Sequence, residues 1–313
     1  GTRTLEQVIA HVRERHPGVD SAEVYDDVVV LAEAGYLDDA DEQRPRMFSQ
    51  RELDRYDRSR CFYRWMDPHP RNSWEPQVRL RDAAVTVVGV GGIGSSAAMA
   101  LACSGVGRLH LVDHDTVELS NLNRQILYDE ADVGRPKVDA AVRELRGHNS
   151  DITITGQARR LIGQDDFAGL VSDCDLLLVA CDTPANARVL ANQACLAAGK
   201  PWAEARYHGP MAYAMLFVPG RGPCYECAWR DHRERMHRLG SDDESPRSDF
   251  SNPVIAPVAM MSGLFMAHMA LAWITQSMPV APGQLRGVDL LADADLVTDY
   301  HHYPDCPACG EKP

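Results

Sequence analysis

Four glycines lie in a short turn between an apolar run and a helix of small residues: Gly89, Gly91, Gly92 and Gly94. Residues 85–90 are β-branched apart from Gly89 and predict a strand, and residues 95–104 predict a helix. Glycines in such a turn let backbone N–H groups approach a phosphate, and the N-terminus of the following helix favours an anion. Asp113 follows about 20 residues later, where an acid can accept hydrogen bonds from ribose hydroxyls. The spacing predicts a nucleotide site, but NAD, FAD and ATP all use it, and an ordinary strand-to-helix turn is the alternative.

Four of the nine cysteines form two C-x-x-C pairs: Cys224 with Cys227, and Cys306 with Cys309. Four thiolates suit a closed tetrahedral zinc site that has no open position for catalysis. Because the pairs are far apart in the sequence, zinc is expected to fasten the C-terminal tail to the fold. His301 and His302 are expected to be surface residues, since four cysteines already complete the metal's shell. The odd number of cysteines fits a reducing, cytoplasmic location better than a disulfide framework.

Further side chains that could act on a phosphate lie between and after the predicted strands: Asp115, Asn121, Arg124, Gln125, Lys137 and Asp182. Cations offset the charge when one anion attacks another, as a carboxylate does at a phosphate. Asp182 follows a buried run at residues 175–180, and ligands bind at the carboxyl ends of strands in open α/β sheets. Solvated surface charge is the alternative for the two cations, and a helix N-cap is the alternative for Asp182.

The elements that must position these residues alternate between strand-like and helix-like patterns. The expected strands are residues 85–90, 108–112, 152–155, 175–180 and 212–218. The expected helices are residues 95–104, 137–148 and 185–198, and the charged segment 229–252 is expected to be a loop. This alternation predicts an α/β fold with a Rossmann-like, mainly parallel sheet and helices on both faces.

The combination of motifs resembles the ThiF/MoeB family of adenylyltransferases, which are similar to ubiquitin-activating enzymes. The resemblance extends over about residues 53–310 and includes the glycine turn, residues 113–115, 120–125 and 134–137, Asp182, both C-x-x-C pairs and an Arg-Tyr-x-Arg motif that ends at Arg58. It implies binding of ATP and Mg²⁺, and transfer of AMP to the C-terminal carboxylate of a peptide or small carrier protein.

The resemblance also implies roles for individual residues. Arg124 and Lys137 match the family's phosphate-binding cations, and Asp182 matches the acid that holds Mg²⁺. Asp113 matches the ribose-binding acid, with Asp115, Asn121 and Gln125 as further nucleotide contacts. Arg58 matches an arginine that reaches into the neighbouring subunit's site, which implies a homodimer.

One departure from the family bears on the substrate. Residues 228–257 contain no cysteine, although members that form a thioester or an acyl-persulfide place one there. The enzyme is therefore expected to stop at the acyl-adenylate or to pass it to an amine or amide, as in the ribosomal-peptide-modifying branch of microcin C type. Adenylation of a ubiquitin-like sulfur carrier of ThiS or MoaD type is the first alternative. A non-catalytic subunit that binds a leader peptide is the second.

Residues 4–38 have helical periodicity, interrupted at Pro17-Gly18. They resemble the helical half of the winged-helix, leader-binding modules of PqqD type; a helical appendage for packing or dimerisation is the alternative. Residues 38–46 have the composition of a linker. We therefore expect a peptide-binding appendage at residues 1–46 and an ATP-binding domain with structural zinc at residues 47–313.

Charge and hydropathy limit the possible partners. The net charge of −13 argues against general binding to nucleic acid or to a membrane surface, because both require a basic field. Residues 255–274 are apolar enough to resemble a membrane span, but they contain Pro257, Gly263 and His268. They are expected to form a buried helix.

Overall fold

The structure is a computed structural model that describes residues 3–34, 36–37, 42–66, 72–238 and 253–310. The chain divides into two compact units: Gly1–Arg79 with Thr275–Met278, and Leu80–Ile274 with Pro279–Pro313. The two units are groups of residues that contact one another, which is a different property from folding independently. The domain boundary expected between residues 46 and 47 therefore stays a prediction.

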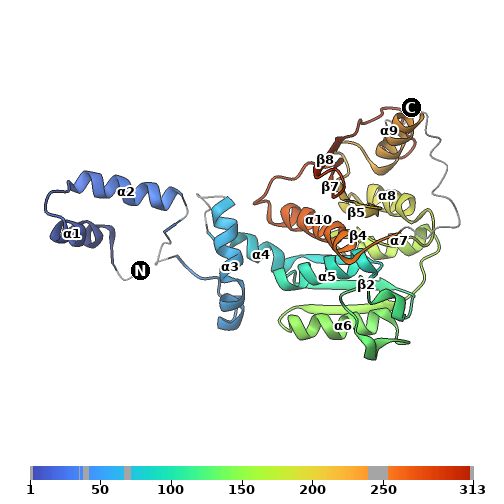
Figure 1. Ribbon diagram of the computed structural model, residues 1–313, viewed down its shortest axis with the longest axis horizontal. Helices are drawn as coiled ribbons and strands as arrows, with labels where there is room; N and C mark the ends of the chain where they lie inside the picture. The colour runs from blue at the N-terminus through green and yellow to red at the C-terminus, as the bar shows by residue number, and fades with distance from the viewer. Residues whose placement is uncertain (1–2, 35, 38–41, 67–71, 239–252, 311–313) are drawn as a thin grey trace. The chain divides into compact units, whose positions relative to one another are not determined.

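The larger unit is built on an eight-stranded sheet with the order β3-β2-β1-β4-β5-β6-β7-β8 (Figure 1). The strands are β1 (Ala84–Val88), β2 (Arg108–Asp113), β3 (Thr153–Ala158), β4 (Leu176–Val179), β5 (Trp202–His208), β6 (Met211–Phe217), β7 (Gln284–Asp289) and β8 (Ala294–Asp299). Pairing is parallel from β3 to β5 and antiparallel from β5 to β8. The predicted α/β class and mainly parallel sheet are confirmed.

Helices connect the parallel strands: α5 (Gly92–Ser104), α6 (Lys137–His148), α7 (Gln164–Ser172) and α8 (Ala187–Ala198). Two short 3₁₀ helices, Leu119–Asn121 and Glu130–Asp132, lie between β2 and α6. The chain moves outward from β1 through α5 and α6, and returns to the other side of β1 through α7 and α8. Right-handed crossovers therefore place these two pairs on opposite faces of the sheet.

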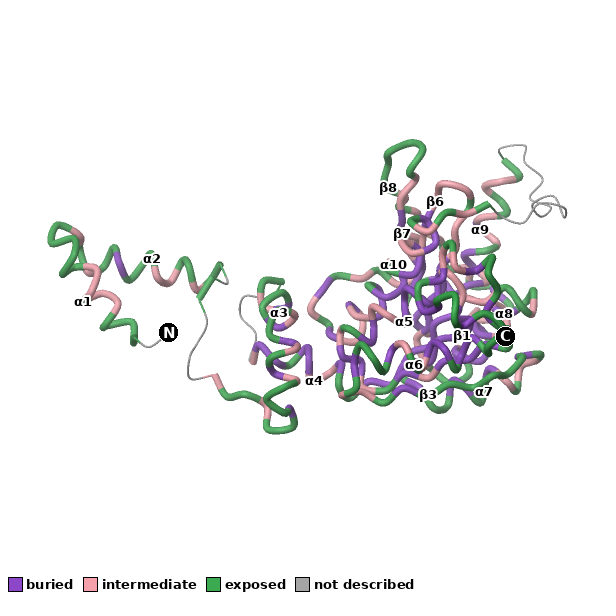
Figure 2. Tube along the Cα trace, turned by 60° about the horizontal axis from the view of Figure 1, so that its bottom comes forward, coloured by how far each residue is buried: buried purple, intermediate pink, exposed green. Residues whose placement is uncertain are grey.

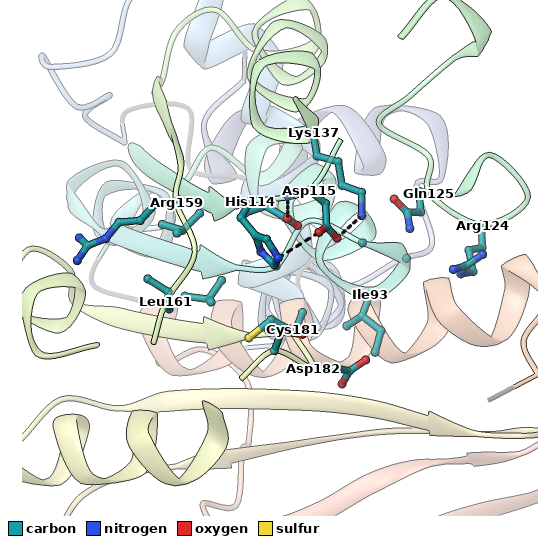
Figure 3. A pocket seen from close by; sticks show the side chains of 18 of the residues that line it. Ile93, His114, Asp115, Arg124, Gln125, Lys137, Arg159, Leu161, Cys181 and Asp182 are labelled. Carbon is teal, nitrogen blue, oxygen red and sulfur yellow. Dashed lines mark hydrogen bonds and ion pairs between the residues drawn. The ribbon is translucent and has the colours of Figure 1, made fainter. Parts of the chain in front are cut away.

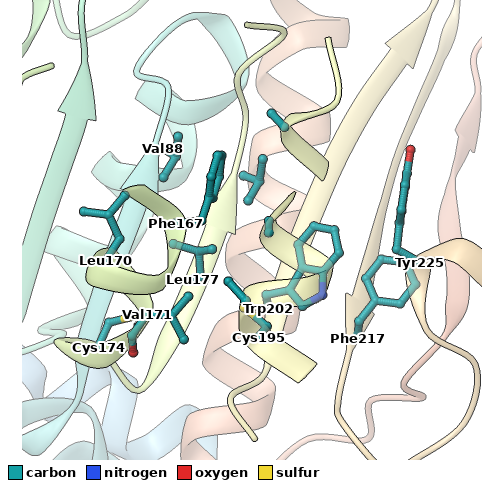
Figure 4. Close-up of a cluster of buried hydrophobic side chains, with 14 of the residues drawn as sticks. Val88, Phe167, Leu170, Val171, Cys174, Leu177, Cys195, Trp202, Phe217 and Tyr225 are labelled. Carbon is teal, nitrogen blue, oxygen red and sulfur yellow. Dashed lines mark hydrogen bonds between the residues drawn. The ribbon is translucent and has the colours of Figure 1, made fainter. Parts of the chain in front are cut away.

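A buried cluster fills the space between the sheet and the α7–α8 face (Figure 4). It includes Val88 of β1, Leu177 of β4 and Phe167 of α7, and it continues to Trp202 of β5 and Phe217 of β6. All five side chains are at most 2% exposed. The carboxyl ends of β1 and β4 are thus held by a continuous apolar core.

Helix α9 (Tyr225–Arg238) includes the first part of the charged segment that was expected to be a loop. That prediction is therefore wrong for residues 229–238. Ion pairs one helical turn apart, Arg230 with Glu234 at 3.2 Å and Arg235 with Asp231 at 3.3 Å, support this helix. The rest of the expected loop lies outside the described residues.

The predicted buried helix is α10 (Ala256–Thr275). Within the described chain it is the one helix long and apolar enough to cross a membrane, and 56% of its apolar window is buried in the structure. A Cβ at Gly263 would lie 2.1 Å from Ser96 Oγ and 2.2 Å from the Ile93 carbonyl, so α10 packs directly on α5 at this glycine. Such packing is typical of a core helix.

The smaller unit is helical in its described part, with α1 (Leu5–Arg15), α2 (Ser21–Glu33), α3 (Gln50–Met66) and the start of α4 (Glu75–Asp82). The two helices predicted on either side of Pro17-Gly18 are present. Figure 2 shows that α1 and α2 are largely exposed, and Val24 is the one buried residue of this pair. No strand occurs among the described residues of this unit, so its winged-helix character stays a prediction.

Candidate nucleotide site

The glycine turn brings β1 and α5 into very close contact. A Cβ at Gly94 would lie 1.8 Å from the Gly89 carbonyl oxygen, and Gly89 itself has φ +87°. Helix α5 begins at Gly92 with Gly91 as its N-cap, so Gly92 and Gly94 lie in the first helical turn and not in the preceding loop. This arrangement presents the helix N-terminus to the space above β1, as binding of an anion requires.

A cavity of about 220 Å³ opens at the carboxyl ends of the parallel strands (Figure 3). It brings together nine of the sequence-predicted site residues: Gly89, Gly91, Gly92, Asp113, Asp115, Arg124, Gln125, Lys137 and Asp182. Other lining residues, to which the sequence analysis gave no role in the site, include His114, Arg159, Cys181 and Tyr207. Residues separated by more than 100 positions in the chain, such as Gly89 and Tyr207, therefore share one pocket.

Asp113 shapes the glycine turn as well as lining the cavity. One of its carboxylate oxygens accepts a hydrogen bond from the Val90 N–H at 2.8 Å, and the other accepts one from the Asp115 N–H at 2.9 Å. Each carboxylate oxygen has a second lone pair. The predicted contact with a ribose thus stays possible, with the acid already fixed in place.

Lys137 enters the cavity from the first turn of α6 and is held by an acid. Its Nζ lies 2.9 Å from Asp115 Oδ2, and His114 Nε2 lies 3.3 Å from Asp115 Oδ1. The lysine side chain is 7% exposed, whereas that of Asp115 is half exposed. An ammonium that is shielded from water interacts strongly with a phosphate placed beside it.

Arg124 and Gln125 occupy the side of the cavity near the helix N-terminus. Arg124 Nη1 donates to the Ser120 carbonyl at 3.1 Å and to Asn123 Oδ1 at 2.8 Å. Gln125 is 4% exposed, and its Oε1 has no hydrogen-bond partner in the described chain. The Gln125 amide lies against the glycine turn, because a Cβ on Gly91 would come within 3.7 Å of its Nε2.

Asp182 follows β4 and projects into the cavity with its side chain 94% exposed (Figure 3). The N-cap of α8 is Asn186, so the alternative that Asp182 caps this helix is wrong. An exposed carboxylate at the mouth of a phosphate pocket is a suitable oxygen ligand for Mg²⁺. Asp113, His114 and Asp115 bring further ligand atoms within 4.8 Å of one another in the same pocket.

A charged network that the sequence did not reveal reaches Asp182 from the buried side. Arg188 Nη2 lies 3.5 Å from Asp182 Oδ1, while Arg188 Nε donates to the buried Glu204. Arg206 Nε donates to the same Glu204 oxygen at 2.9 Å, and its Nη2 donates to the Tyr225 hydroxyl at 2.7 Å. Burial opposes ionisation of Glu204, but the two guanidinium groups outweigh it and hold the pKa of Glu204 below its usual value.

Replacement of Glu204 with glutamine should lower the free energy of unfolding by about 3 kcal/mol near neutral pH, because two partly buried guanidinium groups lose the counterion that they share. The folded-state pKa of Glu204 is depressed below its ordinary value of 4.5. The carboxylate therefore stabilises the fold fully above pH 4.5, and this contribution is lost as the pH falls through the folded-state pKa. In urea unfolding, the free energy of unfolding should therefore differ between wild type and variant at neutral pH, and this difference should become smaller in the acid range. An equal difference at neutral and acid pH would contradict this account.

Three sequence-predicted site residues do not line the cavity. Asn121 lies in the first 3₁₀ helix, where its Oδ1 accepts from the Glu118 N–H at 3.2 Å. Gly94 lies in α5 beneath the turn. Arg58 is an exposed residue of α3 in the other unit, and its role in a partner's site stays a prediction.

The four predicted zinc ligands converge. Cys224 Sγ lies 3.7 Å from Cys306 Sγ, Cys227 Sγ lies 3.5 Å from Cys309 Sγ, and all four sulfurs lie within 4.8 Å of one another. Tetrahedral Zn–S bonds of about 2.3 Å place the sulfurs about 3.8 Å apart, which these separations fit. His301 is exposed and contacts Asp231, as expected for a residue outside the metal's shell.

A mainly parallel sheet that carries a glycine turn, a shielded lysine and acids around one cavity defines a nucleotide-binding α/β protein. Residues 56–308 match the model of the ThiF family. The chain belongs to this family and has its ATP-binding adenylyltransferase fold.

Relatives by sequence include an adenylyltransferase that is also a sulfurtransferase, and an adenylyltransferase of a sulfur carrier protein. The protein named "Adenylyltransferase and sulfurtransferase MOCS3" from Bos taurus is 34% identical over 269 residues, which cover 85% of this chain and 55% of MOCS3. "Sulfur carrier protein ThiS adenylyltransferase" from Escherichia coli K12 is 32% identical over 235 residues, covering 75% of this chain and 88% of that protein. The chain thus spans little more than half of MOCS3.

Similar solved structures include the E. coli enzyme MccB. The crystal structure of MccB with ATP has a TM-score of 0.76 at 26% identity, covering 94% of this chain and 83% of that chain. The microcin C7 biosynthetic enzyme MccB in complex with N-formylated MccA has a TM-score of 0.77 with the same identity and coverage.

Proposed function

We propose that this protein uses ATP and Mg²⁺ to transfer AMP to the C-terminal carboxylate of a ribosomally synthesised peptide. The observation that carries the proposal is the extent of the similarity to MccB. Because it covers 94% of this chain, it includes much of the helical segment before residue 56, where the family match begins. MccB is a biosynthetic enzyme solved with ATP and with the peptide MccA.

The chain's own side chains fit the chemistry of this step. A bond forms between a carboxylate oxygen and the α-phosphorus, and the bond to the pyrophosphate leaving group breaks. Both reactants are anionic, so the positive charges of Lys137 and Arg124 stabilise the charge that accumulates in the transition state. Asp182 would hold Mg²⁺, which supplies further positive charge at the phosphates when bound. Arg58 of a second copy would add a cation in trans, so we propose a homodimer.

Adenylation of a small sulfur carrier is the second candidate, because MOCS3 and the ThiS adenylyltransferase are relatives by sequence. Pyrophosphate–ATP exchange with a panel of peptides and of carriers that end in Gly-Gly separates the two. Peptide-dependent exchange, with an AMP-sized mass increase on the peptide or its later product, supports the proposal. Exchange with carriers alone overturns it, and no exchange with any substrate indicates a non-catalytic binding subunit.

The exposed apolar residues of α2 provide a sharper test of peptide docking. Val30 is 61% exposed and Leu31 is 44% exposed, although both belong to the helix. Replacing both with glutamate should raise the KM for the peptide at least about tenfold, because charges would replace apolar docking area, and should leave the KM for ATP unchanged. Leu291→Glu, at a position 85% exposed in the β7–β8 turn, is the control and should change neither value. An unchanged peptide KM in the double variant would separate α2 from substrate binding.

A further inference from the structure

Two arginines next to the nucleotide cavity share one buried carboxylate. Glu204 Oε2 accepts hydrogen bonds from Arg188 Nε and, at 2.9 Å, from Arg206 Nε. The side chains of Glu204, Arg188 and Arg206 are 5%, 12% and 26% exposed, respectively. Asp182 lies 3.5 Å from Arg188, but its side chain is 94% exposed, so water weakens its attraction for the guanidinium. The shielded part of this network therefore has one positive charge in excess.

Arg206 has a fixed orientation and one unused donor group. Its Nη2 donates to the Tyr225 hydroxyl at 2.7 Å, and its guanidinium lies 5.7 Å from the ring centroid of Tyr225 and 5.8 Å from that of Trp229. Both distances allow a cation–π attraction. Arg206 Nη1 has no hydrogen-bond partner within the described chain and is open to solvent. A guanidinium that is oriented in advance loses less entropy when it binds a carboxylate.

Tyr213 brings a second donor to the same face of the sheet. It lies directly opposite Arg206 in the antiparallel pair of β5 and β6, so the two side chains are neighbours. Its hydroxyl has no hydrogen-bond partner among the described residues and is also open to solvent. Burial raises the pKa of Tyr213, so the hydroxyl keeps its proton and can donate it to an acceptor. The exposed ring of Trp229, on α9, adds an apolar surface beside Arg206.

The position of these donors fits a carboxylate of the second substrate. Neither Arg206 nor Tyr213 lines the nucleotide cavity, but the network reaches that cavity because Asp182 lines it and contacts Arg188. The C-terminal carboxylate of the peptide must itself reach the α-phosphorus. An extended residue spans about 3.3–3.6 Å, so the side chains just before that carboxylate can reach the network. We propose, on the basis of the proposed function, that Arg206 and Tyr213 bind an acidic side chain close to the C-terminus of the peptide.

The test measures binding of two short peptides to the zinc-loaded full chain, with Mg²⁺ and a non-hydrolysable ATP analogue present. In acetyl-Ala-Glu-Ala-amide the side chain carries the only carboxylate, and acetyl-Ala-Gln-Ala-amide is its neutral match. The glutamate peptide should bind saturably and about tenfold more tightly than the glutamine peptide, because hydrogen bonds between charged groups are stronger than neutral ones. In NMR titrations the indole N–H of Trp229, assigned with Trp229→Phe, should shift with the glutamate peptide.

Substitutions locate the preference for the acidic peptide. Arg206→Gln should remove it, and Tyr213→Phe should reduce it about threefold, because one donor is lost while the ring is kept. The control is Arg286→Gln, the same substitution at an exposed arginine of β7. Arg286 is paired with Ala214, the neighbour of Tyr213 in β6, so its side chain lies on the opposite face of the sheet. This variant should keep the full preference.

The proposal is overturned if wild type binds the glutamate peptide no more tightly than the glutamine peptide. It is also overturned if folded Arg206→Gln, checked by circular dichroism and zinc content, keeps the preference. Both outcomes concern binding and not AMP transfer. Failure of the proposed function would appear separately, as pyrophosphate–ATP exchange with carriers alone, so the two failures are distinguishable.

Discussion

AMP transfer by the Lys137→Ala variant is expected to fall by about 10²–10³-fold, since one charge that stabilises the transition state is removed. Lys137 is the buried cation of the nucleotide cavity, and its ion pair with Asp115 fixes where the ammonium lies. The loss should appear in kcat, because the charge on the phosphates is greatest in the transition state. Single-turnover measurements of pyrophosphate release, with ATP at saturation, would give this value.

The matched control is Lys200→Ala, which removes a lysine from another ion pair of the same unit. Lys200 Nζ lies 3.8 Å from Asp175 Oδ1, and this lysine does not line the nucleotide cavity. The control should keep its activity and its Tm within a few degrees of wild type, as is usual for a surface pair worth about 1 kcal/mol or less. If Lys137→Ala kept wild-type activity, or if both variants lost activity equally, the role assigned to Lys137 would be wrong.

Most of the nucleotide site was predictable because its residues adjoin strong local patterns. The glycine turn and Asp113 mark the ends of neighbouring strands, and Lys137 begins an amphipathic helix. Arg188 and Glu204 gave no comparable signal, because they meet only when α8 packs beside β5. Contacts of that kind depend on tertiary structure, which periodicity within a short window does not describe.

The part of the fold that the sequence did not indicate is also explained by composition. β5 contains alanines and a glutamate, residues that strands generally disfavour, and the buried Glu204 is tolerated there because it pairs with Arg206. β7 and β8 are mostly half-exposed or exposed, so apolar and polar residues alternate only weakly along them. The parallel strands β1 and β4, in contrast, are buried on both faces and read as continuous apolar runs.

Loss of a zinc ligand is expected to have the largest effect on stability. Cys227 is fully buried at the start of α9, and its cluster joins that helix to Cys306 and Cys309 near the C-terminus. Structural zinc sites contribute about 10 kcal/mol or more to folding in small domains, and a third of that would lower the Tm of a chain of this size by about 10 °C. Cys227→Ser should therefore bind less zinc and melt about 10 °C below wild type.

The control for this variant is Cys103→Ser, the same substitution at an exposed position of α5 outside the cluster. It should retain zinc, measured by elemental analysis, and its Tm by calorimetry should match that of wild type. Removing zinc from wild type with a chelator should reproduce the low Tm of Cys227→Ser, and the chelator should change the Tm of Cys227→Ser little. If the chelator left the Tm of wild type unchanged, the four cysteines would not stabilise the fold through a metal, since a closed tetrahedral site acts by joining distant segments.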